Sequence, residues 1–140
     1  MIILDTNVLS ELFKPTPAPE VLGWLAMQPV PSLYTTAVTQ AEMLFGLEIM
    51  AKGKRRSVLE SLTQRMFEVT FVDRILSFDA DAARQFALIA SYRRALGRAI
   101  TLGDAQIAAI ARSRGAKLAT RNTADFEHCG IDVLSPWAPP

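Results

Sequence analysis

Short apolar runs alternate with longer segments of helical hydrophobic spacing along this chain. The first run, Ile-Ile-Leu at 2–4, ends abruptly at polar residues and predicts a short buried strand. The run at 75–78 is also strand-like, although it could be only an extended lead-in to the next helix. The predicted strands cover residues 2–4, 33–35, 69–73, 75–78, 117–120 and 131–134.

Helix signals fill the segments between these strands. Pro19 suits the first turn of a helix, and Gly53, Gly97 and Gly115 stand where three helical segments would stop. The acidic start of the segment at 79 is typical of a helix N-terminus. The predicted helices cover residues 7–13, 20–27, 37–52, 54–67, 79–96 and 102–114.

Strands that alternate with helices predict an α/β domain with a central, mostly parallel sheet covered by helices. A chain of 140 residues is long enough to bury a real core in one domain. The proline-rich stretch at 14–19 is too short to separate two domains, and there is no internal repeat. We therefore expect a single domain over 1–140.

The composition excludes several classes of protein. No apolar run approaches the roughly eighteen residues that a membrane-spanning helix needs. Asp5 interrupts the N-terminal apolar stretch and no basic region precedes it, so a signal peptide is not expected. The single cysteine, Cys129, cannot form an internal disulfide, and nothing resembles zinc-ligand spacing. A cytoplasmic protein without membrane contact is the expectation.

Polar side chains follow two of the predicted strands. In an open α/β sheet, ligands bind beyond the carboxyl ends of the strands. Asp5 stands directly after the first strand, Thr120 and Asn122 stand where the strand at 117–120 ends, and Asp125 follows three residues later. Asp5 could instead be only a helix N-cap, and the segment around Asn122 is also typical of Asx turns.

Two predicted helices add acids in unusual places. Glu42 lies one turn from Val38 and Phe45, so it interrupts an apolar stripe, and Asp104 shares a helix face with Ile107. Carboxylates are almost never fully buried unless they are paired or bind a metal, which suggests a common site. Alternatively, Glu42 is exposed if its helix is rotated, and Asp104 only complements the helix dipole.

Convergence of Asp5, Glu42, Asp104 and Asp125 would raise their pKa values or require a cation. Oxygen ligands without His or Cys suit Mg²⁺ or Mn²⁺ rather than zinc. Such an ion polarises a phosphodiester and lowers the pKa of a bound water that attacks phosphorus. The only histidine, His128, leaves no Ser-His-Asp set, and there is no glycine-rich phosphate loop.

The distribution of charge favours a polyanionic substrate. The net charge is only +1, but with four of the fourteen acids bound to metal, ten remain against fifteen Lys and Arg. Basic residues concentrate at 52–56 and at Arg93, Arg94 and Arg98, and such groups can contact phosphates. The segment at 52–56 is, however, more typical of a solvated turn between helices.

Four blocks of sequence together resemble a known family. "ILDTNVLSEL", "TTAVTQAEMLFGL", "GDAQIAAIAR" and "LATRNTADF" occur in order along essentially the whole chain. In this respect the chain is similar to the PIN domain, and among PIN proteins to the VapC and FitB toxins of type II toxin–antitoxin systems. The resemblance implies a three-layer α/β/α domain with a parallel sheet and a Mg²⁺- or Mn²⁺-dependent endoribonuclease site.

The resemblance also implies roles for individual residues. Asp5, Glu42 and Asp104 match the family's three acidic positions and would bind the metal. Polar positions that support the site match Thr6 or Asn7, and Thr120.

The sequence departs from the family pattern at the fourth acidic position, which falls on Asn122. Asp125 could be the fourth acid, or Asn122 could orient a water while Asp125 caps a turn. A chain without the fourth acid could instead be a non-catalytic regulatory module that acts through an antitoxin–DNA complex.

The resemblance further implies a homodimer and a small cognate antitoxin as inhibitor. The antitoxin's tail would bind near the acidic pocket, and its own domain would bind operator DNA. The helical hairpin over 41–62 is the expected docking groove, because its helices carry more apolar surface than one sheet face needs.

Overall fold

A five-stranded parallel sheet forms the centre of the computed structural model, which describes residues 1–138. The strand order is β3-β2-β1-β4-β5, with β1 in the middle and every neighbouring pair parallel. The strands are β1 (Ile2–Leu4), β2 (Leu33–Thr36), β3 (Ile75–Leu76), β4 (Lys117–Ala119) and β5 (Val133–Leu134).

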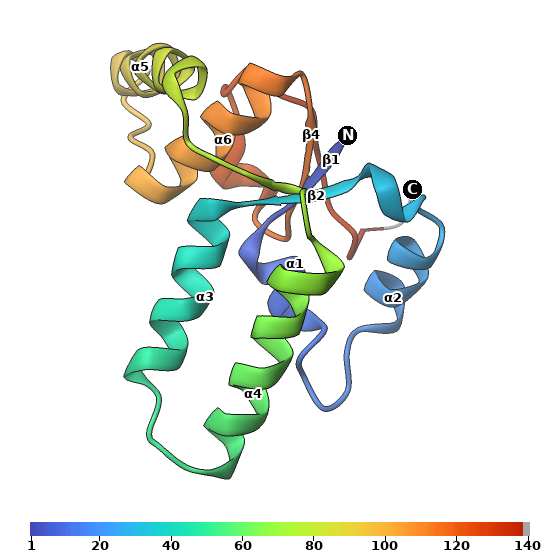
Figure 1. Cartoon of the computed structure of the whole chain (residues 1–140). Helices are drawn as coiled ribbons and strands as arrows, with labels where there is room; N and C mark the ends of the chain where they lie inside the picture. Colours follow the sequence, from blue (N-terminus) through green and yellow to red (C-terminus); the bar gives the residue numbers. More distant parts are fainter. Residues whose placement is uncertain (139–140) are drawn as a thin grey trace.

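Helices pack on both faces of the sheet, which confirms the three-layer α/β/α fold (Figure 1). α5 and α6 lie on one face and α1, α2 and the end of α4 on the other, while α3 and α4 form a hairpin that extends away from the sheet. No helix within residues 1–138 combines the length and apolarity that crossing a bilayer requires. The helices are α1 (Thr6–Glu11), α2 (Pro19–Ala26), α3 (Ala37–Ile49), α4 (Lys54–Arg65), α5 (Ala80–Ala95) and α6 (Leu102–Arg114).

The sheet separates two apolar cores. Successive strand residues point to opposite faces, so Ile3 packs in the core under α5 and α6, and Leu4 packs in the core under α1 and α2. Leu118 and Ala119 divide in the same way. Because both cores contribute burial to the same short strands, β1 and β4 are held rigidly at the centre of the domain.

The predicted strand at 69–73 is wrong. α4 continues instead through a π-helical turn, Met66–Thr70. Phe67 and Phe71 are one helical turn apart, so the helical path buries both rings while Val69 and Val72 stay exposed. An alternating strand would have put Val69 and Phe71 on the same face. Of the segment at 75–78, only Ile75–Leu76 pairs with β2.

Side chains that follow the strands cap the helices that come next. The Thr36 hydroxyl at the end of β2 accepts the N–H of Thr39 and starts α3. Asp79 caps α5 in the same way, and Gly115 ends α6 with φ of 61°, a left-handed conformation that glycine adopts without strain. The predicted helix boundaries are therefore close, except that α1 ends at Glu11 and α3 at Ile49, earlier than expected.

Candidate active site

The site lies where the strand order reverses. The chain leaves β1 for β2 on one side, whereas β4 lies on the other side of β1, so the connections that follow β1 and β4 diverge at this edge of the sheet, the place where open α/β sheets bind ligands. Asp5 is the first residue after β1 and Thr120 the first after β4. The Asp5 N–H donates to the Ala119 carbonyl at 3.0 Å, which fixes the two strand ends side by side.

Asp5 is a buried carboxylate, 6% exposed, whose two oxygens have different partners. Its Oδ1 accepts the Thr6 N–H at 2.8 Å and so caps α1. Its Oδ2 accepts the Thr120 hydroxyl at 2.8 Å, and the Asn7 amide lies 3.4 Å away. Capping and a role in the site are therefore compatible for this residue.

Hydrogen bonds of Asn7 and Thr120 connect the segments that follow β1 and β4. The Asn7 amide nitrogen donates to the Thr120 hydroxyl at 3.2 Å, and its Oδ1 accepts the Arg121 N–H at 3.1 Å. The Thr120 oxygen also accepts the Asn122 N–H at 3.1 Å. This network joins the start of α1 to the loop after β4, so Asp5 has little freedom to move.

Glu42 reaches the site from α3. The Thr6 hydroxyl donates to its Oε2 at 2.7 Å and lies 3.1 Å from the Thr39 hydroxyl. The inference that Glu42 interrupts a buried stripe is wrong, because Glu42 is exposed and Phe45 is 65% exposed. The alternative of a rotated helix is the one observed, and from that position the carboxylate still reaches Thr6.

Asp104 lies in the first turn of α6, where its N–H donates to the Thr101 hydroxyl at 3.3 Å. It is half-buried and shares the helix face of Ile107, which is fully buried, as predicted. Gly103 precedes it, and a Cβ at this glycine would lie 3.2 Å from Glu42 Oε1. The glycine therefore lets the Glu42 carboxylate approach the start of α6 beside Asp104.

The pKa of Asp5 is raised, mainly because burial disfavours the charged carboxylate. Hydrogen bonds from Thr120 and Thr6 oppose this shift, whereas the negative charges of Glu42 and Asp125 add to it. Asp5 therefore experiences the field of both an α3 acid and an acid from the loop after β4.

The pKa of Asp104 is raised as well, again with burial as the largest cause. The hydrogen bond with Thr101 lowers it, and the charges of Asp5 and Asp125 raise it. The structure thus places the four predicted acids close enough for their charges to interact. Asn122 contacts Thr120 only through its backbone N–H.

A fifth acid, Glu11, shows what a structural carboxylate looks like in this fold. Glu11 is 4% exposed, pairs with Lys14 at 2.9 Å and accepts the Ala18 N–H at 2.9 Å, so its pKa is lowered. Within residues 1–138, none of the four site acids has a Lys or Arg within ion-pair distance; these acids are Asp5, Glu42, Asp104 and Asp125. Unpaired acids grouped at a ligand-binding edge, two of them with a raised pKa, are typical of functional sites.

In each of the two basic regions expected to contact phosphates, an arginine is already bound to other groups of the protein. Arg93 is 6% exposed and donates to backbone carbonyls, so it is not available to a phosphate. Arg56 pairs with Glu48 and Glu60, so it is tied to the hairpin's own acids at the solvated turn. The sequence pattern missed Arg93 because buried arginines are rare.

Replacement of Thr120 by Val should weaken both the site and the fold. Valine keeps the shape of Thr120 but removes the donor to Asp5 and the acceptor of the Asn7 and Asn122 groups. We expect a loss of about 1–3 kcal/mol in unfolding free energy and a fall of about 10- to 100-fold in activity or divalent-ion affinity. Denaturant unfolding and calorimetric titration with Mn²⁺ measure these two quantities; unchanged Mn²⁺ affinity would contradict the role of Thr120.

The fold and the site together define a class of protein. It is a three-layer α/β/α domain with acids grouped where the strand order of the sheet reverses. The PIN domain family matches residues 2–131, and the chain belongs to this family. The family resemblance seen in the sequence is thereby confirmed.

Relatives match over nearly the full chain. A VapC ribonuclease of Sinorhizobium fredii is 41% identical over 139 residues, which cover 99% of each protein. Toxin FitB of Neisseria gonorrhoeae is 36% identical over 137 residues, which cover 98% of this chain and 99% of FitB. The solved structure of FitAB bound to a DNA fragment has a TM-score of 0.94 at 36% identity, covering 100% of this chain and 98% of that one.

Proposed function

We propose that this chain is the ribonuclease toxin of a type II toxin–antitoxin pair and that it hydrolyses RNA phosphodiester bonds with Mg²⁺ or Mn²⁺. The observation that carries the proposal is the group of interacting carboxylates, Asp5, Glu42, Asp104 and Asp125, at the carboxyl edge of the sheet. The names of the VapC ribonuclease and toxin FitB relatives support it. A single domain over 1–140, a homodimer and a cytoplasmic location stay predictions.

The donor set fits a hard divalent cation, because it consists only of carboxylate oxygens. Within residues 1–138, no three acidic, histidine or cysteine side chains are gathered tightly enough to enclose one ion. Mg²⁺ is usually bound through one or two carboxylates and keeps several waters, so Asp5 and Asp104 would hold it, with Glu42 close by. Such an ion polarises the phosphodiester and lowers the pKa of a coordinated water.

The chain's own residues would orient and deprotonate. Thr120 and Thr6 hold the Asp5 carboxylate in one orientation, which would fix the direction from which Asp5 meets a cation. Glu42 and Asp125 are the exposed acids of the site. Either carboxylate can accept a proton from the attacking water, as a general base positioned next to the phosphate.

We assign the fourth acidic position to Asp125 rather than Asn122. The support is that the charge of Asp125 raises the pKa of both Asp5 and Asp104. The alternative function, a non-catalytic regulatory module, rests on a missing fourth acid, and in our proposal Asp125 supplies that acid.

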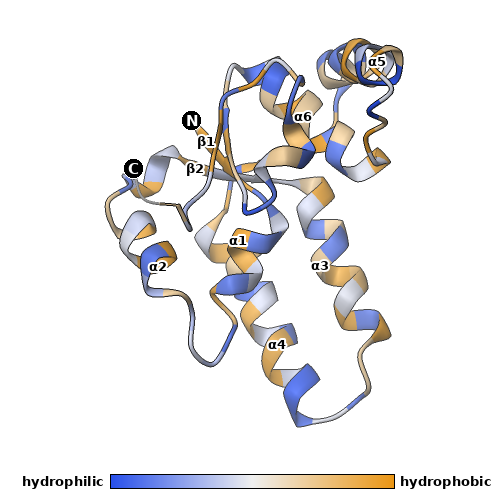
Figure 2. Ribbon diagram, turned by 180° about the vertical axis from the view of Figure 1, so that it is seen from behind, coloured by the Kyte–Doolittle hydropathy of each residue, from blue (hydrophilic) through white to orange (hydrophobic). Residues whose placement is uncertain are grey.

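We place the antitoxin on the α3–α4 hairpin. Hydrophobic residues recur along both helices (Figure 2), and several of their side chains are exposed, among them Phe45 at 65%, Ile49 at 70% and Val58 at 50%. A cavity of about 640 Å³ lies between Phe13 and α4. A second cavity of about 240 Å³ is lined by Thr6, Glu42 and residues of both hairpin helices, so a bound helix could continue into the site. The FitAB complex bound to DNA supports operator contact through the antitoxin.

One experiment tests the substrate and the partner together. The purified protein is incubated in Mn²⁺ with RNA and with DNA of the same sequence, with and without its cognate antitoxin. We expect the protein to cleave the RNA but not the DNA, and the antitoxin to inhibit this cleavage. Val58→Glu, a change at a half-exposed position, should cleave normally but need at least about tenfold more antitoxin, because a charge would be buried in the apolar contact. Equal cleavage of DNA would contradict RNA as the substrate. Normal inhibition of Val58→Glu would contradict the antitoxin site on the hairpin.

A further inference from the structure

We propose that Arg93 is a positioning residue of the active site, which acts by holding the loop that carries Asp125. The inference rests on the proposed function and deepens it. Arg93 lies in the last turn of α5, on an element that carries none of the four acids, and is 6% exposed. Burial of an arginine is costly in solvation, so its surroundings need an explanation.

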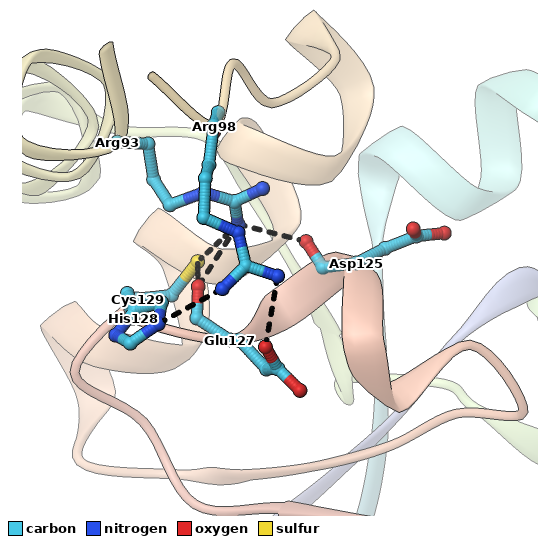
Figure 3. Close-up of polar contacts among 6 residues, drawn as sticks. All are labelled: Arg93, Arg98, Asp125, Glu127, His128 and Cys129. Atoms are coloured by element: carbon cyan, nitrogen blue, oxygen red, sulfur yellow. Dashed lines mark hydrogen bonds and ion pairs between the residues drawn. The ribbon is translucent and has the colours of Figure 1, made fainter. Parts of the chain in front are cut away.

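The guanidinium of Arg93 gathers backbone carbonyls from two segments (Figure 3). Its Nε donates to the Arg98 carbonyl at 2.6 Å. One terminal nitrogen donates to the carbonyls of Asp125 at 3.0 Å and Glu127 at 2.9 Å, and lies 3.6 Å from the Cys129 sulfur. The planar fork of arginine suits several acceptors in fixed directions, and here it clamps the loop on both sides of Phe126.

Arg93 binds the backbone of Asp125 and leaves its carboxylate free. Figure 3 shows the Asp125 carboxylate pointing away from the guanidinium. Within residues 1–138, Arg93 has no carboxylate partner at ion-pair distance, yet its positive charge lowers the pKa of Asp104. The charge of buried Arg93 therefore acts on Asp104, and its guanidinium directly contacts the loop that carries Asp125.

The loop needs such a clamp because its own regular structure is slight. Thr123–Phe126 is a single 3-10 turn, and His128 has φ of 62°, a left-handed conformation that is uncommon outside glycine. Arg98 adds a second tie, to the Glu127 carboxylate at 3.1 Å and the His128 ring at 3.1 Å. Without Arg93, the carbonyls that set the direction of Asp125 would lose their donor.

The test compares Arg93→Lys with a matched control, Arg74→Lys. Arg74 also donates to backbone carbonyls, those of Val30, Leu33 and Thr70, but beside the amino ends of β2 and β3. Lysine keeps the charge at each position and loses the fork. We expect both variants to have a lower Tm, while only Arg93→Lys loses about 10- to 100-fold in kcat at unchanged KM and binds Mn²⁺ about tenfold more weakly in calorimetry.

A double-mutant cycle with Asp125→Asn separates positioning from general stability. If Arg93 acts through Asp125, adding Arg93→Lys to Asp125→Asn should cause less than about a twofold further loss in kcat, because contacting residues are not additive. A fully multiplicative loss overturns the proposal, as do wild-type kcat and Mn²⁺ affinity in Arg93→Lys. Failure of Arg93→Lys and Arg93→Gln to fold would assign Arg93 to stability and overturn it too. A wild-type protein that cleaves no RNA refutes the proposed function, a different outcome.

Discussion

Asp5→Asn is expected to reduce RNA cleavage by about 1000-fold while the domain remains folded. Asparagine keeps the size of Asp5 and can still cap α1, but it removes the charge that would hold a cation between the strand ends. Loss of about 4 kcal/mol of transition-state stabilisation corresponds to this factor. Single-turnover cleavage of a labelled RNA measures it, and cleavage at near wild-type rate by Asp5→Asn would overturn the assignment of roles.

The stability of Asp5→Asn provides the control. The folded-state pKa of Asp5 lies above its ordinary value of 3.8, so the folded protein binds the proton more tightly than the unfolded chain does. Without divalent ions, the wild-type protein therefore loses stability as the pH rises from about 3.8 through the folded pKa. Asparagine does not titrate, so the stability of Asp5→Asn should increase relative to that of the wild-type protein as the pH rises. Urea unfolding in EDTA at pH 4 and pH 7 checks this sign; a variant that is equally destabilised at both values would contradict it.

Removal of divalent ions with EDTA should abolish RNA cleavage, and Mn²⁺ or Mg²⁺ should restore it. Within residues 1–138, the histidine His128 contacts Arg98 rather than the site acids, so it is not placed to replace the ion. An ion that binds only the folded state also stabilises it, by about 2.7 kcal/mol at a concentration of 100 times Kd. Mn²⁺ should therefore raise the Tm of the wild-type protein.

Asp104→Asn is the matched variant for the effect of the ion. Asp104 is half-buried at the start of α6, and asparagine there keeps the side-chain shape. We expect little or no rise of Tm with Mn²⁺ in this variant. Cleavage that persists in EDTA, or an equal Mn²⁺-dependent rise of Tm in Asp104→Asn, would contradict a metal site built on these acids.

The sequence predicted the parts of this molecule that depend on local pattern. Alternation of strands and helices gave the α/β class, and the break from "IIL" to Asp5 placed an acid at the carboxyl edge of the sheet. Thr120 could be placed beside it because parallel strands end at the same edge. These inferences needed only the direction of the chain and the burial of short apolar runs.

Other features depend on three-dimensional packing, and the sequence predicted them wrongly or not at all. The segment at 69–73 has the residue types of a strand, but the spacing of Phe67 and Phe71 fits a continued helix against the core. Glu42 was assigned to an inward face because exposed apolar neighbours such as Phe45 look like a core stripe in sequence. The role of Arg93 depends on a loop more than thirty residues away, which no local pattern reveals.

The most direct test is a crystal structure of the protein soaked in Mn²⁺, with the ion located by anomalous scattering. The account predicts a peak beyond the carboxyl ends of β1 and β4, coordinated by the carboxylates of Asp5 and Asp104, with the side chain of Asp125 rather than Asn122 facing the ion. A peak away from these acids, or no peak at a concentration of Mn²⁺ that supports RNA cleavage, would contradict it.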